Sequence, residues 1–195
     1  MIRESMIALL ALSSAAFAQQ ECAAIQSPED RLNCYDEAFK ITTTPEAPGN
    51  WNVEIEKSKL DDTTTVMMMV LSEEALPGRF GGSEKGALMV RCKESTTSVY
   101  TIWGGHFMSD HQGGGRVDYR IDTAPAKNVA MDVSTDNKAL GLWQGGASIP
   151  FVKAMFGASS IYMRATPFSE SSQEMTFNIK GIEEAITPLR EACGW

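Results

Sequence analysis

The chain has 195 residues and a formal net charge of −8, from 17 Lys and Arg residues against 25 Asp and Glu residues. Non-specific nucleic-acid binding requires a basic surface, so we expect no nucleic-acid partner. Hydrophobic residues make up 43% and charged residues 22%, which is typical of a globular protein and excludes a disordered chain or a coiled coil. The length suits one domain with a small appendage.

The N-terminus predicts export. Residues 6–17 form a largely apolar run that is too short to span a bilayer, and Ala16-Phe17-Ala18 fits the small-x-small pattern of a cleavage site. We interpret residues 1–18 as a secretory signal peptide and expect a soluble protein of the periplasm. A first helix of the fold is the alternative interpretation of this run. No stretch of about 18 apolar residues occurs, so we expect no membrane span in the mature chain.

Four cysteines follow the predicted cleavage site: Cys22, Cys34, Cys92 and Cys193. In an oxidising compartment an even number of cysteines indicates disulfides, and four allow three pairings. The alternative is a metal site built from all four thiolates, which the absence of a C-x-x-C pair disfavours.

The pairing depends on the local structure between the first two cysteines. Ser27 fits a helix N-cap and Pro28 the first helical position, so we expect a short helical turn, a reversal and a helix from Pro28 to about Phe39. The reversal brings Cys22 back towards Cys34 and leaves the other two cysteines for each other. We expect a disulfide-linked helical hairpin over residues 19–40, a linker over residues 41–50 and a β-sandwich domain over residues 51–195.

Short strands dominate the remainder, with turn residues between them, which is typical of an antiparallel sandwich or barrel. We expect about eight: Trp51–Glu56, Thr63–Leu71, Ala87–Lys93, Ser98–Trp103, Val117–Asp122, Lys138–Trp143, Ser160–Thr166 and Glu174–Lys180. Leu76–Gly86 is predicted to be a glycine-rich connection. Helices are expected at Ile149–Phe156, starting at Pro150, and at Ile182–Cys193, broken at Pro188. The predicted fold class is mainly β, sandwich-like and disulfide-stapled, with an N-terminal helical hairpin and a C-terminal helix.

The common catalytic and nucleotide-binding motifs are missing from the sequence, so we expect no enzymatic activity and no cofactor. The two histidines, His106 and His111, flank Asp110 next to three glycines, and this trio could in principle hold a metal ion. We favour a mobile surface loop there and expect no metal site. Methionines such as Met67 to Met69 are interpreted as core residues, because successive strand side chains point to opposite faces.

One polar pattern stands out on the predicted strands: Arg91, Arg120, Asp122 and Arg164 fall on polar faces, with Asp118 beside them in the period-two pattern. Arginine and aspartate on neighbouring strands can pair across a sheet as a structural ladder. The alternative is a recognition patch for an anionic group. We favour the ladder, so Arg120→Ala is expected to cost about 1–3 kcal/mol of stability.

Several short motifs together resemble one family. They are Arg31-Leu32-Asn33-Cys34-Tyr35-Asp36, Arg91-Cys92, Tyr119-Arg120-Ile121-Asp122, Arg164-Ala165-Thr166-Pro167-Phe168 and Cys193-Gly194-Trp195, with Cys22, Trp51 and Asp61-Asp62-Thr63 between or before them. In order and approximate spacing they are similar to the type VI secretion-associated periplasmic proteins TagO and VasI. The glycine-rich segment around His111 does not match the family pattern.

The resemblance implies a non-enzymatic accessory factor of type VI secretion or of a related envelope or phage-like apparatus. Such a factor acts in the periplasm by binding a protein partner or peptidoglycan. The alternative is a periplasmic inhibitor of a basic cell-wall hydrolase, similar to lysozyme inhibitors, since an acidic protein complements a basic enzyme.

Overall fold

The computed structural model describes residues 22–38, 49–78, 81–109 and 114–195. The chain forms two compact units, residues 1–45 and residues 46–195. The predicted signal peptide and most of the predicted linker lie outside the described residues. Within the described residues, no helix has both the length and the apolar character needed to cross a membrane.

The N-terminal unit contains helix α2, Pro28–Ala38. Its start is the predicted one, because the Ser27 side-chain oxygen accepts a hydrogen bond from the Asp30 N–H at 3.4 Å. The chain reverses before the helix, and a disulfide joins Cys22 to Cys34 with the Cα atoms 5.5 Å apart. The reversal thus places the two cysteines as the helix-start pattern predicts.

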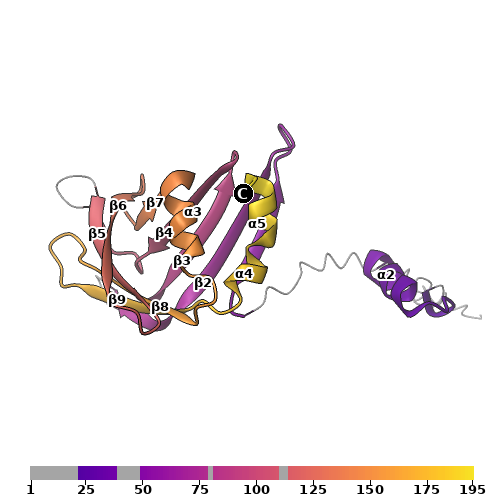
Figure 1. The fold of residues 1–195 in the computed structure, drawn as a ribbon, viewed down its shortest axis with the longest axis horizontal. Helices are drawn as coiled ribbons and strands as arrows, with labels where there is room; N and C mark the ends of the chain where they lie inside the picture. The colour runs from indigo at the N-terminus through magenta and orange to yellow at the C-terminus, as the bar shows by residue number, and fades with distance from the viewer. Residues whose placement is uncertain (1–21, 39–48, 79–80, 110–113) are drawn as a thin grey trace, which may run out of the picture. The chain divides into compact units, whose positions relative to one another are not determined.

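The second unit is built on one antiparallel sheet of nine strands in the order β1-β2-β3-β4-β7-β6-β5-β8-β9 (Figure 1). The strands are β1 Asn52–Lys57, β2 Thr64–Pro77, β3 Ser83–Lys93, β4 Thr96–Ile102, β5 Gly114–Ile121, β6 Lys127–Val133, β7 Ala139–Leu142, β8 Ser160–Ala165 and β9 Gln173–Asn178. This confirms the mainly-β fold class. The four strands β1 to β4 form a meander, and β7 rather than β5 lies next to β4.

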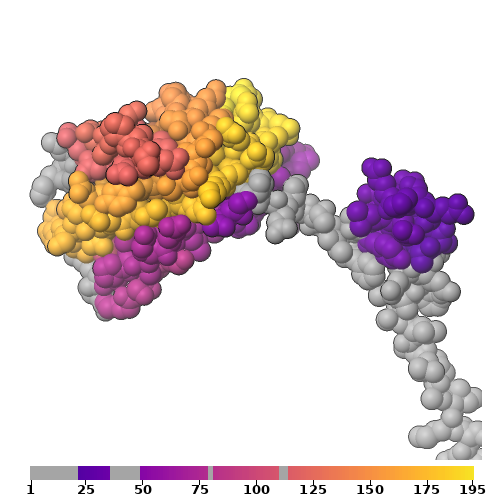
Figure 2. Space-filling view, turned by 60° about the horizontal axis from the view of Figure 1, so that its bottom comes forward, coloured from indigo at the N-terminus to yellow at the C-terminus, as the bar shows by residue number. Residues whose placement is uncertain are grey.

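The sheet curls so that β9, at one end of the strand order, packs against β2 near the other end. The N–H of Thr176 on β9 donates to the Glu74 carboxylate on β2 at 2.9 Å. A Cβ atom added to Gly86 of β3 would clash with the Met175 sulfur on β9 and would lie 2.9 Å from the Ile102 carbonyl oxygen, so a larger residue requires a shift there. In Figure 2 the gold and yellow surface of the residues after β8 runs alongside the magenta surface of β2.

Three helices pack on the sheet: α3 Gly145–Lys153, α4 Ile182–Ala185 and α5 Thr187–Cys193. Figure 1 shows α3 lying over β4 and α5 over β2 and β3. The core lies between helices and sheet, where Leu88 and Val90 are fully buried beside Leu189. The Cys92–Cys193 disulfide, with the Cα atoms 5.8 Å apart, links β3 to α5 on that side. The adjacent strand residue Arg91 therefore faces away from α5.

Several element boundaries differ from the prediction. β2 continues to Pro77 and β3 begins at Ser83, so most of the expected connection Leu76–Gly86 is strand. An irregularity in the register between Leu71 and Ala75 interrupts the alternation, which is why the sequence pattern stops early.

Two further elements were wrong or missing in the sequence-based prediction. Helix α3 begins at Gly145 and holds Pro150 inside it, so the expected start at Pro150 was wrong. Its first turn is closed by bonds from the N–H groups of Ala147 and Ser148 to the Gln144 carbonyl. Strand β6 was not predicted at all.

Candidate functional site

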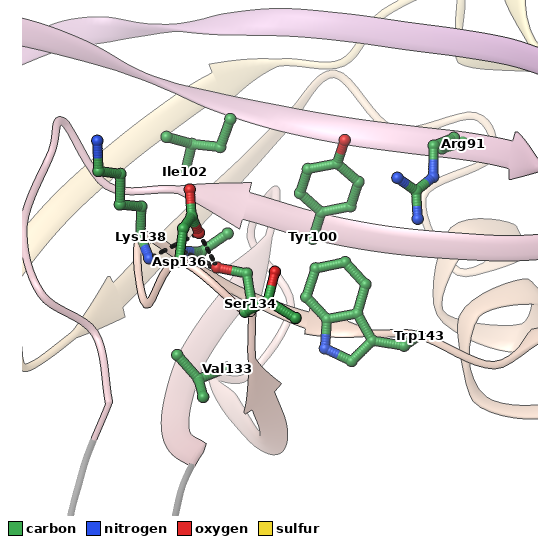
Figure 3. Close-up of a pocket in the computed structure, with 10 residues that line it drawn as sticks. Arg91, Tyr100, Ile102, Val133, Ser134, Asp136, Lys138 and Trp143 are labelled. Carbon is green, nitrogen blue, oxygen red and sulfur yellow. Dashed lines mark hydrogen bonds between the residues drawn. The ribbon is translucent and has the colours of Figure 1, made fainter.

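A cavity of about 550 Å³ opens on the sheet where β3, β4 and β7 lie side by side. Figure 3 shows Arg91 at one end of it, Lys138 and Asp136 at the other, and Tyr100 and Trp143 between them. The volume falls in the range of small-molecule sites, and the lining combines aromatic and aliphatic side chains with polar and charged ones. We call this cavity the β3–β7 pocket.

The floor of the β3–β7 pocket is a pair of stacked aromatic rings. The centroids of Tyr100 and Trp143 lie 5.1 Å apart with 28° between the ring planes. Tyr100 is directly opposite Gly141 in the β4–β7 register, and a Cβ atom on Gly141 would lie 2.6 Å from the Tyr100 Cβ and 3.0 Å from the Trp143 ring. The missing side chain at this position thus makes room for the stack. The Trp143 indole N–H donates to the Asp132 carbonyl at 3.0 Å, which fixes the ring.

Arg91 supplies a cation next to this floor. Its guanidinium carbon lies 5.6 Å from the centroid of the Tyr100 ring, a cation–π distance. The Arg91 Nε is buried, and no acceptor within the described ranges bonds to it. Burial raises the pKa of the Tyr100 hydroxyl, against the smaller opposing effect of Arg91, so this phenol stays neutral at physiological pH. The side chain of Arg91 therefore lines the pocket with one buried N–H that has no acceptor among the described residues.

The opposite end of the pocket is polar, and Asp136 is hydrogen-bonded within it. The Ser134 hydroxyl donates to the Asp136 carboxylate at 2.6 Å, and the Lys138 backbone N–H donates to the same oxygen at 3.2 Å. These hydrogen bonds, that of Ser134 first, hold the pKa of Asp136 below its usual range. Among the described residues that line the pocket, Asp136 is the one carboxylate, and it stays ionised at neutral pH.

The predicted arginine–aspartate cluster is divided by the structure. Arg120, Asp122 and Arg164 line a second cavity of about 480 Å³ at β5 and β8, whereas Arg91 lies in the β3–β7 pocket. One cross-strand pair of the expected kind exists: the Arg164 guanidinium donates to the Asp118 carboxylate at 2.8 Å, and both side chains are about half exposed. Exposed pairs contribute little to stability.

The expected stability loss for Arg120→Ala needs revision in light of this geometry. Arg120 is exposed, and its Nε donates to the backbone carbonyl of Asp122, two residues away, at 2.9 Å. Replacing such a surface side chain changes stability by no more than about 0.5 kcal/mol. We now expect thermal melts of Arg120→Ala and the wild type to agree within that amount. A loss of 1 kcal/mol or more, which the ladder hypothesis requires, would restore Arg120 as a structural residue.

Asp122 connects the turn after β5 to the start of β8. It adopts a left-handed backbone conformation, with φ at 45°, directly after β5. Its carboxylate accepts hydrogen bonds from the N–H groups of Ser159 and Ser160, at 3.1 and 2.8 Å, and so ties this turn to the start of β8. These bonds, Ser159 first, hold the pKa of Asp122 below its usual range.

The lowered pKa of Asp122 predicts a dependence of stability on acid. A carboxyl group with a depressed pKa in the folded state stabilises the fold fully above the unfolded value, about 4, and loses this contribution as the pH falls through the folded value. Asp122→Asn removes the charge and keeps the size of the side chain. We expect the difference in melting temperature between pH 7 and pH 3 to be smaller in Asp122→Asn than in the wild type. An identical difference would contradict this.

His106 is not part of a mobile surface loop, and that interpretation was wrong. It is 1% exposed, with Nδ1 2.8 Å from the Glu170 carboxylate and Nε2 2.9 Å from the Pro77 carbonyl. Glycine-flanked sequence suggested a loop, but these two acceptors, distant in sequence, bury the ring. His111 and Asp110 lie outside the described residues. In the parts of the chain that are described, no three His, Cys, Asp or Glu side chains gather in a way that could hold a metal ion.

Sequence reasoning missed the aromatic half of the β3–β7 pocket. Tyr100 and Ile102 share one face of β4, and Val99 and Thr101 the other, so both faces of this strand are largely apolar. That pattern alone indicates a strand covered on both sides. The face with Tyr100 and Ile102 lines the pocket in the structure. This depends on the pairing of β4 with β7, some forty residues later in the chain, which the sequence pattern does not show.

The chain is similar to a known protein family and to a solved structure. Residues 21–195 match the family described as type VI secretion system VasI, EvfG, VC_A0118. This match confirms the resemblance drawn from the short motifs. Among solved structures, the crystal structure of invasion associated protein b from Bartonella henselae is similar, at 11% identity and a TM-score of 0.47, over 75% of this chain and 96% of that one. None of the curated proteins matches the chain.

Proposed function

The chain belongs to the VasI family of type VI secretion proteins, and from this membership we propose that it is a non-enzymatic accessory factor that binds another component of the cell envelope in the periplasm. The observation that carries the proposal is the family match over residues 21–195. The two disulfides support an oxidising compartment such as the periplasm, because cytosolic thiols are kept reduced.

We propose the β3–β7 pocket as the surface through which the protein binds. It combines a cation, a stacked aromatic floor and an aliphatic rim, and aromatic and arginine side chains dominate the energetics of protein interfaces. Its single carboxylate is held ionised by its own hydrogen bonds, which supports recognition rather than catalysis.

The test is deletion and complementation in a strain that carries this gene and an active type VI secretion system. We expect deletion to reduce both secretion and killing of a competitor strain, and the full-length gene to restore them. A matched gene that lacks codons 2–18 keeps the protein in the cytoplasm and is expected to restore neither. Unchanged secretion after deletion would overturn the accessory function, and rescue by the leaderless gene would overturn action in the periplasm.

The inhibitor hypothesis makes a different prediction in the same strains. If the protein blocks a basic hydrolase, purified protein should inhibit lysozyme at stoichiometric concentration, and deletion should sensitise cells to lysozyme without changing secretion. The acidic net charge of −8 is the feature that favours this second candidate.

A further inference from the structure

We propose that the β3–β7 pocket takes the C-terminal carboxylate of a peptide chain whose last side chain is apolar. The inference rests on the proposed binding function, since it names the chemistry of the partner at that same surface. It follows from the state of Arg91, from the shape of the aromatic floor and from the charge of the whole protein.

Arg91 is the residue that would hold the carboxylate. A buried N–H without an acceptor costs free energy, and native structures rarely leave one. The Nε of Arg91 is in this state, and no carboxylate within the described ranges forms a salt bridge with its guanidinium. The Nε–H and one neighbouring N–H of an arginine lie parallel and match the two oxygens of a carboxylate. A ligand carboxylate at Arg91 would supply the missing acceptor.

Aromatic and apolar side chains lie next to the position of that carboxylate. Within the pocket, the stacked rings of Tyr100 and Trp143 are flanked by the apolar side chains of Ile102 and Val133 (Figure 3). A group that extends from Arg91 over this floor is therefore in contact with apolar and aromatic surface. The last side chain of a peptide, when it is aliphatic or aromatic, fits this environment, and burial of its apolar surface stabilises the complex.

The lining favours a peptide over a sugar acid. Recognition of a sugar ring needs several free donors and acceptors around the aromatic group to bind the hydroxyls. Here the Trp143 N–H is bonded to the Asp132 carbonyl, and the Ser134 hydroxyl is bonded to Asp136. The Trp143 and Ser134 donors beside the aromatic floor are thus already engaged within the protein.

The net charge of the protein limits the number of negative charges that the ligand can carry. A protein of net charge −8 repels a polyanion, such as an acidic segment or an anionic polysaccharide, before it reaches a single arginine. One terminal carboxylate on an otherwise neutral apolar end avoids most of that repulsion. The C-terminus of a protein chain is the simplest group with this combination.

The experiment uses two probes, N-acetyl-Ala-Ala-Leu with a free C-terminal carboxylate and the same peptide as its C-terminal amide. Binding to the mature protein is followed by NMR through the indole N–H signal of Trp143, assigned with the Trp143→Phe variant. We expect a saturable shift with the acid in the millimolar range and at least about tenfold weaker binding of the amide. This comparison uses the wild-type protein, so it does not depend on a variant that folds.

Two arginine variants of equal charge locate the contact. Arg91→Gln is expected to abolish the preference for acid over amide. Arg116→Gln, at an exposed position on β5, is the matched control and should keep it. Arg91→Lys keeps the charge and loses the planar pair of donors, so it should retain only part of the preference. Arg120→Gln tests the second cavity, and loss of binding there with Arg91→Gln unaffected would overturn the assignment.

Three further outcomes overturn the proposal. They are equal affinity for acid and amide, no saturable shift with millimolar acid, and a response to N-acetylmuramic acid without one to the peptide. The failure of the accessory function is recognised separately. If Arg91→Gln complements the deletion strain fully, the peptide-binding inference is wrong for secretion while the accessory function stands. If the deletion itself has no effect on secretion, the accessory function fails whatever the peptide titration shows.

Discussion

Replacing both Cys92 and Cys193 by alanine is expected to lower the free energy of unfolding by about 4–5 kcal/mol, the largest effect of any double substitution considered for this protein. The disulfide joins residues separated by 101 positions, so it encloses more than half of the chain and restricts the unfolded state accordingly. In the folded state it holds α5, whose residue Leu189 is fully buried, against β3.

The measurement is a thermal or urea melt of the mature protein, followed by a probe of the sheet such as far-UV circular dichroism. A loss of this size lowers the melting temperature by on the order of 10 °C in a domain of this length. Non-reducing peptide mapping of the wild type should recover one peptide that contains Cys92 linked to Cys193. Any other pairing there would contradict the basis of the prediction.

The matched control is the double variant Cys22→Ala with Cys34→Ala. These cysteines are only 12 positions apart and belong to the N-terminal unit, not to the unit that contains the sheet. We expect the melt of the β unit to remain unchanged in this variant. If the two double variants lowered the melting temperature equally, the long loop closed by Cys92 and Cys193 would not be the source of the stability.

Features that depend on neighbours in the sequence could be predicted. The pairing of Cys22 with Cys34 follows from a helix start at Pro28, because the reversal and the helix are both local. The break of the C-terminal helix follows from Pro188, which lacks the N–H that a continuous helix needs, and the structure separates α4 from α5 just before it.

Strand β6 was missed, although Val129, Met131 and Val133 alternate along it with more exposed residues. Lys127, Asn128, Ala130 and Asp132 are all exposed, and only Met131 is fully buried. Residues such as lysine, asparagine and aspartate are depleted in strands, so this segment is a strand because β5 and β7 pair with it on both sides.

One part of the candidate site could be predicted from the sequence, and the other part depends on strand pairing. Arg91 stands out in the sequence as a cation on a strand beside a cysteine. Its neighbours across the sheet are set by register, which puts Tyr100 opposite Gly141 and brings Trp143 onto its ring. Sequence periodicity gives the face of a side chain within its strand, but it does not give the partner strand. The expectation that Arg91 joins Arg120 and Arg164 in one cluster failed on this point.

The second large effect is expected at His106, which lies between two acceptors in the folded protein. Nδ1 is 2.8 Å from the Glu170 carboxylate and Nε2 is 2.9 Å from the Pro77 carbonyl, and the ring is 1% exposed. The imidazole thereby joins the end of β2 to the loop between β8 and β9. Both ring nitrogens therefore lie within hydrogen-bond distance of an oxygen atom from a distant part of the chain.

His106→Ala removes the contacts of the imidazole with the Pro77 carbonyl and the Glu170 carboxylate and leaves a cavity in place of the buried ring. Removing one partner of a buried pair costs about 3–5 kcal/mol. Because the Glu170 side chain keeps 17% exposure, we expect a smaller loss, about 2–4 kcal/mol. The contrast is the Asp118–Arg164 pair, which has the same 2.8 Å separation but about half-exposed side chains, and Arg164→Ala should leave the melting temperature unchanged.

A double-mutant cycle separates the interaction of the pair from the loss of packing around the ring. Urea melts of His106→Ala, Glu170→Ala and the double variant give a coupling free energy, which we expect to be about 1–3 kcal/mol. A buried hydrogen-bonded pair predicts that the double variant is less destabilised than the sum of the single variants, since the carboxylate no longer remains without its partner. If the single losses simply add, His106 contributes through packing alone. A loss below about 0.5 kcal/mol in His106→Ala would show that the segment around His106 opens at little cost, as a surface loop does.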